Sequence, residues 1–273
     1  MERFAYAKST GITVLSALMS DFTYKRHAHE EYALGVTIRG VQQFHLEGSL
    51  HTSRPGGIIR FSPEQVHDGC AAERTCLEYA MLYIPAPLFL EAAGLREAAR
   101  FGAPVVRDPV LAAGILRLAR GAAEGRDELW AGELLLDVVR RAARAEPLAR
   151  AVRGDAAVRR AKEMLRAGRD GRVRLEDICA ELAMSKFHFI RHFKAATGIS
   201  PYQFFLGCKL EHAKHVIQQT RDAYAAVADC GFVDLSHLNR HFRRVYGVTA
   251  SEFARMRGGG PPGPGREEPP AVP

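Results

Sequence analysis

The chain has 273 residues, of which 47% are hydrophobic and 25% charged, values that exclude a disordered, collagen-like or disulfide-scaffold protein and favour two domains. Residues 155–257 hold 18 basic and 11 acidic side chains, whereas residues 1–154 hold 19 and 18, so the positive excess lies in the C-terminal part and indicates a polyanionic partner there. The five cysteines form no C-x-x-C pair and we find no signal or membrane segment, so we expect reduced thiols, a cytoplasmic location and no membrane partner.

Short segments of alternating hydrophobicity fill the first part of the chain. Breaks at Arg39-Gly40, Glu47-Gly48 and Pro55-Gly56-Gly57 separate them. A period of two residues predicts β-strands. The predicted strands cover residues 14–19, 32–39, 41–46, 56–61 and 76–84. Short strands at this regular spacing predict a small β-barrel or sandwich over about residues 10–90.

From Asp108 onward the hydrophobic period becomes helical, and we expect an antiparallel pair of helices within about residues 108–143. This pair either closes the barrel domain or forms the seam of a homodimer. The predicted apolar faces consist of Leu111, Ile115 and Leu118 in one helix and of Leu129, Leu134 or Leu135, and Val138 in the other.

We place the first domain at residues 1–145 and a linker, broken by proline and glycine, at residues 146–154. The second domain covers residues 155–257, and a Gly/Pro-rich tail at residues 258–273 is expected to be disordered.

The basic segment contains an internal repeat. Residues 185–205 align with residues 234–254 at an offset of 49. The identical positions are His188/His237, Arg191/Arg240, His192/His241, Phe193/Phe242, Gly198/Gly247 and Phe204/Phe253. One structural unit is therefore used twice.

Each copy predicts the same local structure. Ser185 and Asp234 are suitable N-caps for a basic helix, and Gly198 and Gly247 are suitable left-handed caps at its end. A short Ala-rich helix and a tight break precede each basic helix, and a capping box follows it. Short helix, tight turn and basic helix form the helix-turn-helix pattern. The fold class is therefore an α+β two-domain protein, with an all-α C-terminal domain.

Residues 155–257 resemble the DNA-binding domain of the AraC/XylS family of bacterial transcription regulators. The segments that carry the resemblance are LEDICAELAMSKFHFIRHFKAATGISPYQFF, KLEHAKHVI and CGFVDLSHLNRHFRRVYGVTASEF. The resemblance implies two helix-turn-helix units joined by a central helix over about residues 201–219. It departs from the family pattern at Ala183, where the first turn usually has glycine, and at Ala226-Val227 in the second short helix.

The two units imply a partner and a role. They would occupy successive major-groove faces of double-stranded DNA, about 34 Å apart, so one protomer would read an asymmetric site. We therefore expect a transcription regulator, an activator or a repressor and not an enzyme, that acts with RNA polymerase as a homodimer and needs no cofactor. Nonspecific architectural DNA binding is the alternative for this half.

The outward side chains of the two basic helices are the predicted DNA contacts, with a solvated charged face as the alternative. Predicted base contacts are Lys186, Phe187, His188, Ile190 and Arg191 in the first helix, and Leu235, Ser236, His237, Asn239 and Arg240 in the second. Predicted phosphate contacts are Lys194, Arg243 and Arg244.

The N-terminal segment resembles the cupin-like sensor domain that often precedes such a DNA-binding domain. The motif residues are His27, His29, Glu31, the Gly57-x5-Pro63 segment and His67. Two readings compete: a metal-dependent cupin enzyme with a DNA-binding tether, and a barrel that binds a small-molecule effector without metal. The second is preferred because the spacing between Pro63 and His67 is one residue too short for the enzyme pattern. The predicted effector pocket consists of His27, His29, Tyr32, Gln43, His45 and His67, with Tyr83 as a further candidate.

Overall fold

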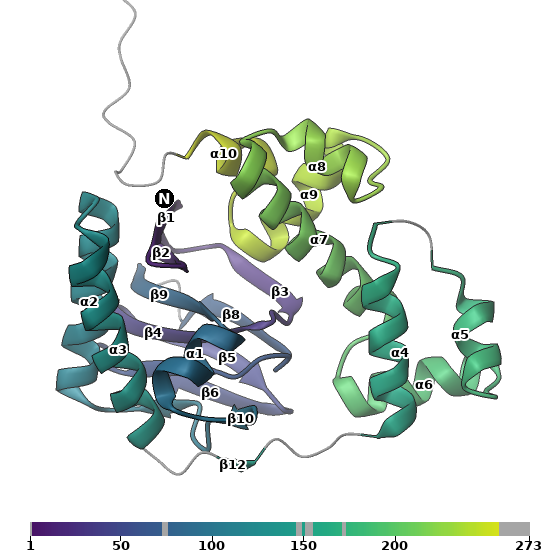
Figure 1. Cartoon of the computed structure of the whole chain (residues 1–273), viewed down its shortest axis with the longest axis horizontal. Coiled ribbons are helices and arrows are strands. Elements are labelled where there is room, and N and C mark those ends of the chain that lie inside the picture. Colours follow the sequence, from purple (N-terminus) through teal and green to yellow (C-terminus); the bar gives the residue numbers. More distant parts are fainter. Residues whose placement is uncertain (1, 73–75, 146–148, 151–154, 171–172, 257–273) are drawn as a thin grey trace, which may run out of the picture.

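The computed structural model describes residues 2–72, 76–145, 149–150, 155–170 and 173–256. A β-barrel with helices on one side forms the N-terminal half, and a purely helical domain forms the C-terminal half (Figure 1). The predicted tail at residues 258–273 and most of the predicted linker at residues 146–154 lie outside the described residues.

Two antiparallel sheets form the barrel. One has the order β1 (Arg3–Ser9), β2 (Ile12–Met19), β9 (Leu77–Pro85), β4 (Glu31–Arg39), β7 (Ile58–Phe61) and β11 (Val105–Val106). The other has the order β3 (Thr23–His27), β8 (His67–Ala71), β5 (Gln42–Leu46) and β6 (Ser49–Ser53). A short pair joins β10 (Ala99–Arg100) to β12 (Ala149–Arg150). The expected strands are confirmed, and β1, β3, β6, β8, β10, β11 and β12 are additional.

The central strands of the larger sheet are buried on both faces. Successive side chains of a strand point to opposite sides. Ala33 of β4 and Met81 of β9 therefore face the barrel interior, whereas Leu34 and Leu82 face a second core on the outside. This second core packs against α1 (Ala86–Ala93), α2 (Pro109–Glu124) and α3 (Glu128–Arg144).

The predicted helical pair is confirmed as α2 and α3, with one correction. Leu111, Ile115 and Leu118 of α2 are buried against the sheet. In α3, Leu135 and Val138 are buried, but the predicted core residue Leu129 is 74% exposed. Leu129 lies nine positions before Val138, which at 3.6 residues per turn places it on the opposite side of the helix.

The C-terminal domain follows the predicted repeat. Its helices are α4 (Ala156–Ala167), α5 (Leu175–Glu181), α6 (Lys186–Thr197), α7 (Pro201–Thr220), α8 (Ala223–Asp229), α9 (Leu235–Tyr246) and α10 (Ala250–Arg255). Gly198 and Gly247 end α6 and α9 with φ of 80° and 77°, as left-handed caps. Both predicted capping boxes are present, at Ser200–Gln203 and at Thr249–Glu252.

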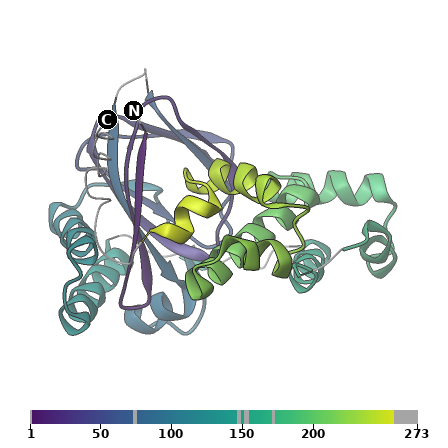
Figure 2. The ribbon, with the colours of Figure 1, turned by 90° about the horizontal axis from the view of Figure 1, so that it is seen from above.

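The two helix-turn-helix units differ in what they pack against. Phe189 and Phe193 of α6 belong to a separate core of the first unit. Leu238 and Phe242 of α9 instead belong to a core that continues into the barrel. Seen from above in Figure 2, the second unit lies over the barrel while the first extends away from it.

Candidate nucleic-acid interface and interdomain cavity

The basic helix of the first unit presents the predicted reading face to solvent. The Ser185 hydroxyl accepts a hydrogen bond from the backbone N–H of His188 and starts α6 at the predicted residue. Phe187 is 77% exposed although it is a large apolar side chain. Ile190 is half-buried against the core of the unit, and the remaining predicted contacts are exposed: Lys186, His188, Arg191 and Lys194.

The basic helix of the second unit, α9, exposes fewer of its predicted base contacts than α6 does. Ser236 and Arg240 are exposed, and so are Arg243 and Arg244. Leu235 is half-buried and packs against the core.

Two of the predicted base contacts of α9, Asn239 and His237, interact with other side chains of the helical domain. The Nδ2 group of Asn239 donates to Oγ of Ser251 in α10 (3.3 Å), and its Oδ1 accepts from the Ser251 backbone N–H (3.2 Å). The His237 ring packs against the rings of Phe232 and His241, at centroid distances of 5.6 and 4.7 Å. Both side chains therefore position α9 within its unit.

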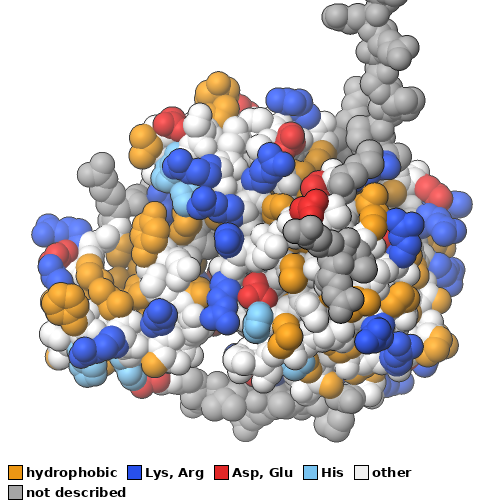
Figure 3. Space-filling model, turned by 180° about the vertical axis from the view of Figure 1, so that it is seen from behind, with side chains coloured by type: hydrophobic (Ala, Val, Ile, Leu, Met, Phe, Trp, Pro, Cys, Tyr) orange, Lys and Arg blue, Asp and Glu red, His pale blue; other side chains and the backbone are white. Residues whose placement is uncertain are grey.

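Lysine, arginine and histidine side chains surround apolar ones on the helical half of the molecule (Figure 3). Together with the exposed arginines of α6 and α9, this surface has the mixture of cationic and apolar groups that DNA backbones and base edges require.

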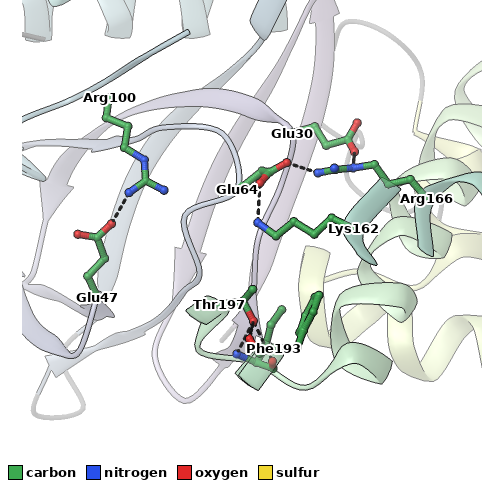
Figure 4. Close-up of polar contacts among 9 residues, drawn as sticks. Glu30, Glu47, Glu64, Arg100, Lys162, Arg166, Phe193 and Thr197 are labelled. Atoms are coloured by element: carbon green, nitrogen blue, oxygen red, sulfur yellow. Dashed lines mark hydrogen bonds and ion pairs between the residues drawn. The ribbon is translucent and has the colours of Figure 1, made fainter. Parts of the chain in front are cut away.

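An ion cluster fastens the first unit to the barrel. Glu64 lies in the loop between β7 and β8, between Lys162 and Arg166 of α4 (Figure 4). The Lys162–Glu64 distance is 2.7 Å, and Arg166 also reaches Glu30 at 2.9 Å. Partial burial raises the pKa of Glu64, but the two cations outweigh burial and hold that pKa below its ordinary value.

A buried ion cluster fastens α7 to the barrel beside the second unit. Nζ of Lys214 lies 2.9 Å from Glu31 of β4 and 3.1 Å from Glu211, and the Tyr246 hydroxyl donates to Glu211 at 2.6 Å. Burial raises the pKa of Glu31, whereas Lys214 and Tyr246 outweigh burial at Glu211 and lower its pKa. The two carboxylates in turn raise the pKa of Lys214 despite its burial, so the ammonium stays charged.

A cavity of about 580 Å³ separates the barrel mouth from the helical domain. The barrel contributes the end of β3 and the turn before β4, and the helical domain contributes α7 and the side of α9. His27 and His29 lie in its wall, as predicted for the effector pocket.

Three imidazoles stand together at the barrel mouth. Nδ1 of His27, His29 and His67 lies 2.7, 2.9 and 2.8 Å from a backbone carbonyl oxygen. A carbonyl oxygen only accepts, so Nδ1 carries the proton and Nε2 is an acceptor in each ring. Burial lowers the pKa of all three, that of His29 to about 4, so the rings are neutral near pH 7.

The cupin metal reading does not fit this geometry. The carboxylate of Glu31 is paired with Lys214 rather than turned toward the imidazoles. His67 stacks on Phe61 at a centroid distance of 3.8 Å. Within the described residues, no set of three or more histidine, cysteine or acidic side chains could hold a metal ion.

Three predicted pocket residues are corrected. Tyr32 faces the outer core, stacks on Phe89 and donates to the carbonyl of Ala99. Gln43 and His45 are on the outer face of β5, where His45 pairs with Asp68. The inward residues of β5 are Gln42, Phe44 and Leu46, so the predicted alternation was right and its phase was wrong. His67 is buried and is not among the residues that line the cavity.

Other cavity residues were not predicted from the sequence. Lys25 and Arg26 come from β3, a strand that the alternation did not predict. Arg244 and His241 come from α9 and reach the cavity because the helical domain packs on the barrel. No local pattern marks such a contact between segments that are far apart in the chain.

Two family models match the chain in the same order as its two domains. The AraC-like ligand binding domain matches residues 9–139, and a helix-turn-helix domain matches residues 178–256. None of the described helices is both long and apolar enough to cross a lipid bilayer.

Known proteins share parts of the sequence and the whole fold. The MmsAB operon regulatory protein of Pseudomonas aeruginosa is 36% identical over 90 residues, which cover 32% of this chain and 29% of that protein. The HTH-type transcriptional regulator YbfI of Bacillus subtilis is 23% identical over 224 residues, 79% of this chain and 81% of that one. ToxT from Vibrio cholerae has the same fold, with a TM-score of 0.63 and 11% identity over 92% of this chain and 99% of ToxT.

A ligand-binding barrel followed by two helix-turn-helix units defines a two-domain DNA-binding regulator. The chain belongs to the AraC/XylS family of transcription regulators.

Proposed function

We propose that this protein is a sequence-specific transcription regulator that reads an asymmetric site on double-stranded DNA with α6 and α9. A small molecule bound in the cavity between the barrel and the helical domain controls it. As a partner of DNA and RNA polymerase it acts in the cytoplasm, and it catalyses no reaction.

One observation supports DNA reading most directly. Arg191 and Arg240 occupy equivalent positions of the repeat, and both are exposed. Within the part of the chain that the structure describes, neither has a side-chain hydrogen bond or ion pair. Each guanidinium is free to reach O6 and N7 of a guanine, the commonest specific contact in a major groove.

The remaining predicted readers divide into two groups. Ser236 on α9 and Lys186, Phe187 and His188 on α6 are exposed and join the arginines in base contact. Leu235, His237, Asn239 and Ile190 support the position of the helices, with contact to a base only at their edges. Lys194, Arg243 and Arg244 bind phosphate.

Selection of bound duplexes from a random pool by the full-length protein tests this function. We expect enrichment of an asymmetric site with two elements about one helical turn apart. If no sequence is enriched, the protein is a nonspecific architectural DNA-binding protein. A palindromic consensus would contradict the reading of DNA by a single protomer.

Homodimerisation is proposed through the outer side of α3. Leu129 is 74% exposed there, and the half-buried Leu136 lies two turns further on the same side. Sedimentation of the wild type and of Leu129→Glu tests this seam, because a buried charge would dissociate a dimer and leave a monomer unchanged.

A further inference from the structure

We propose that the edge strand β3 of the barrel extends the DNA interface of α9, with Lys25 and Arg26 in contact with phosphates beside the bases that α9 reads. The inference rests on the proposed function, because it adds a part of the barrel to the surface that holds the duplex.

A β-bulge turns two neighbouring cations of β3 outward. Two residues separate Tyr24 from His27 on β3, whereas only one separates their partners on β8. The two residues are Lys25 and Arg26, and both are exposed. In a regular strand successive side chains point to opposite faces, and a bulge is a common way to re-aim side chains beside a functional site.

Protection of the sheet edge does not account for these two charges. β3 is the edge strand of its sheet, and charged side chains on an edge usually prevent pairing with another chain. Here β3 lies on the side of the barrel that faces the helical domain, and α7 and α9 pack against it (Figure 1). An edge that two helices cover needs no such protection, so the cations indicate an anionic partner.

The position of the two cations indicates DNA as that partner. Lys25 and Arg26 line the same cavity wall as Arg244 of α9, which is a proposed phosphate contact. Arg240, the proposed guanine contact, lies one turn before Arg244, and both are exposed. A duplex whose bases meet Arg240 would therefore bring its backbone past Arg244 toward β3.

The surrounding charges leave Lys25 available for a phosphate. Within the described part of the chain Lys25 has no ion pair, since the acidic side chains of the cavity wall pair with cations of α4 and α7. Arg26 is partly engaged, because its Nε lies 3.8 Å from Asp68, which also pairs with His45. We therefore expect Lys25 to contribute more than Arg26 as long as Asp68 is charged.

Anisotropy titrations of the full-length protein over a range of salt concentrations test the phosphate contact. Lys25→Gln should weaken the selected site and a random duplex alike, by about two- to fivefold, the range of an exposed ion pair. It should also reduce the slope of log affinity against log salt by about 0.9, and Lys25→Arg should keep the wild-type slope. Arg117→Gln removes an exposed cation of α2, on the side of the barrel away from the helical domain, and should change neither quantity. A wild-type slope in Lys25→Gln would overturn the proposal.

Neutralising Asp68 should have the opposite effect. Asp68→Asn keeps a side-chain oxygen for the backbone N–H of His45 and releases Arg26. It should tighten the binding of both duplexes by about two- to fivefold, whereas Asp68→Asn combined with Arg26→Gln should not. Glu91→Gln, which removes an exposed carboxylate from α1, is the control for net charge. A gain of affinity does not arise from misfolding, and an equal gain in Asp68→Asn and Glu91→Gln would exclude Arg26 as a phosphate contact.

Methylphosphonate substitution of single phosphates locates the contact on the duplex. The base positions affected by Arg191→Ala and by Arg240→Ala identify the elements that α6 and α9 read. Beside the α9 element, one or two neutralised phosphates should weaken binding by the wild type and have no further effect in Lys25→Gln. If such positions lie only beside the α6 element, β3 does not extend the interface of α9.

The comparison of selected and random duplexes separates this proposal from the proposed function. Specific binding by the wild type, with an unchanged salt slope in Lys25→Gln, overturns the barrel contact alone. A reduced slope in Lys25→Gln without preference for any sequence overturns the reading of bases and leaves the barrel contact standing.

Discussion

The hydroxyl of Tyr6 in β1 donates a hydrogen bond of 2.8 Å to the backbone carbonyl of Tyr246, 240 residues later, at the end of α9. Two further contacts join the same segments. The Phe4 ring lies against Gly247, and the Tyr6 ring packs edge-on against Phe253 at a centroid distance of 5.1 Å. The first strand of the barrel therefore holds the end of α9, the second of the two proposed DNA-reading helices.

Tyr6→Phe should weaken this connection. The change removes one buried hydrogen bond and leaves the Tyr246 carbonyl without its donor, which costs about 1 to 2 kcal/mol of unfolding free energy. Urea denaturation followed by circular dichroism measures the loss. Tyr224→Phe is the control because Tyr224 is 69% exposed, and an equal effect of the two changes would mean that the hydrogen bond contributes nothing.

Arg240→Ala should reduce the affinity for the selected DNA site by about 1 to 3 kcal/mol and relax the base preference at one position. The Arg240 side chain is exposed, and a guanidinium can bind one guanine through two hydrogen bonds. Anisotropy titrations with specific and random duplexes give the specificity ratio. If this ratio equals that of the wild type, Arg240 does not contact a base.

Lys194→Ala should weaken specific and random DNA alike. A lysine on phosphate contributes counterion release, so losing it should reduce the slope of log affinity against log salt by about 0.9. Measurement of both duplexes over a range of salt concentrations shows the slope. A change in base preference instead would show that Lys194 contacts a base.

Acid should loosen the contact between the barrel and the first unit through Glu64. Its pKa is lower in the folded protein than its ordinary value of 4.5, so its carboxylate stabilises the fold above that pH. This stabilisation is lost as the pH falls through the lowered pKa. Glu64→Gln should therefore reduce the unfolding free energy near neutral pH, and the difference from the wild type should shrink in acid. Glu133→Gln, on the exposed side of α3, is the control, and a difference independent of pH would exclude the ion cluster as its source.

Ala183→Gly should stabilise the first unit by roughly 0.5 to 1 kcal/mol, since glycine relieves a left-handed backbone at some cost in unfolded-state entropy. Ala183 has φ of +51°, and the same turn of the second unit has Gly231 at φ of +60°. Thermal unfolding measures the gain. Ala195→Gly in the exposed last turn of α6 should have the opposite sign, and destabilisation by both would show that Ala183 is not strained.

The repeat could be predicted closely because local rules determine it. Ser185, Asp234, Gly198 and Gly247 cap their helices through contacts within a few residues, and the buried Phe193 and Phe242 follow from helical periodicity. Such contacts are visible in a short stretch of sequence.

The cavity could be predicted only in part because it depends on distant contacts. Alternation assigns Gln43 and His45 to one face of β5 but does not say which face is inside. Tyr32 lies in β4, which is buried on both faces, so the hydrophobicity of this strand does not show which of its side chains face the barrel interior. Arg244 and Lys214 reach the barrel through packing that no local pattern encodes.

Two constraints favour glycine at position 247. Its left-handed backbone, with φ of 77°, caps the end of α9, and a Cβ atom there would collide with the Phe4 ring. A swap of sensor domains between relatives would therefore have to transfer the opening strand together with the matching end of the last helix-turn-helix unit. The two halves of this regulator cannot be exchanged as independent modules, and their joint surface must be inherited as one piece.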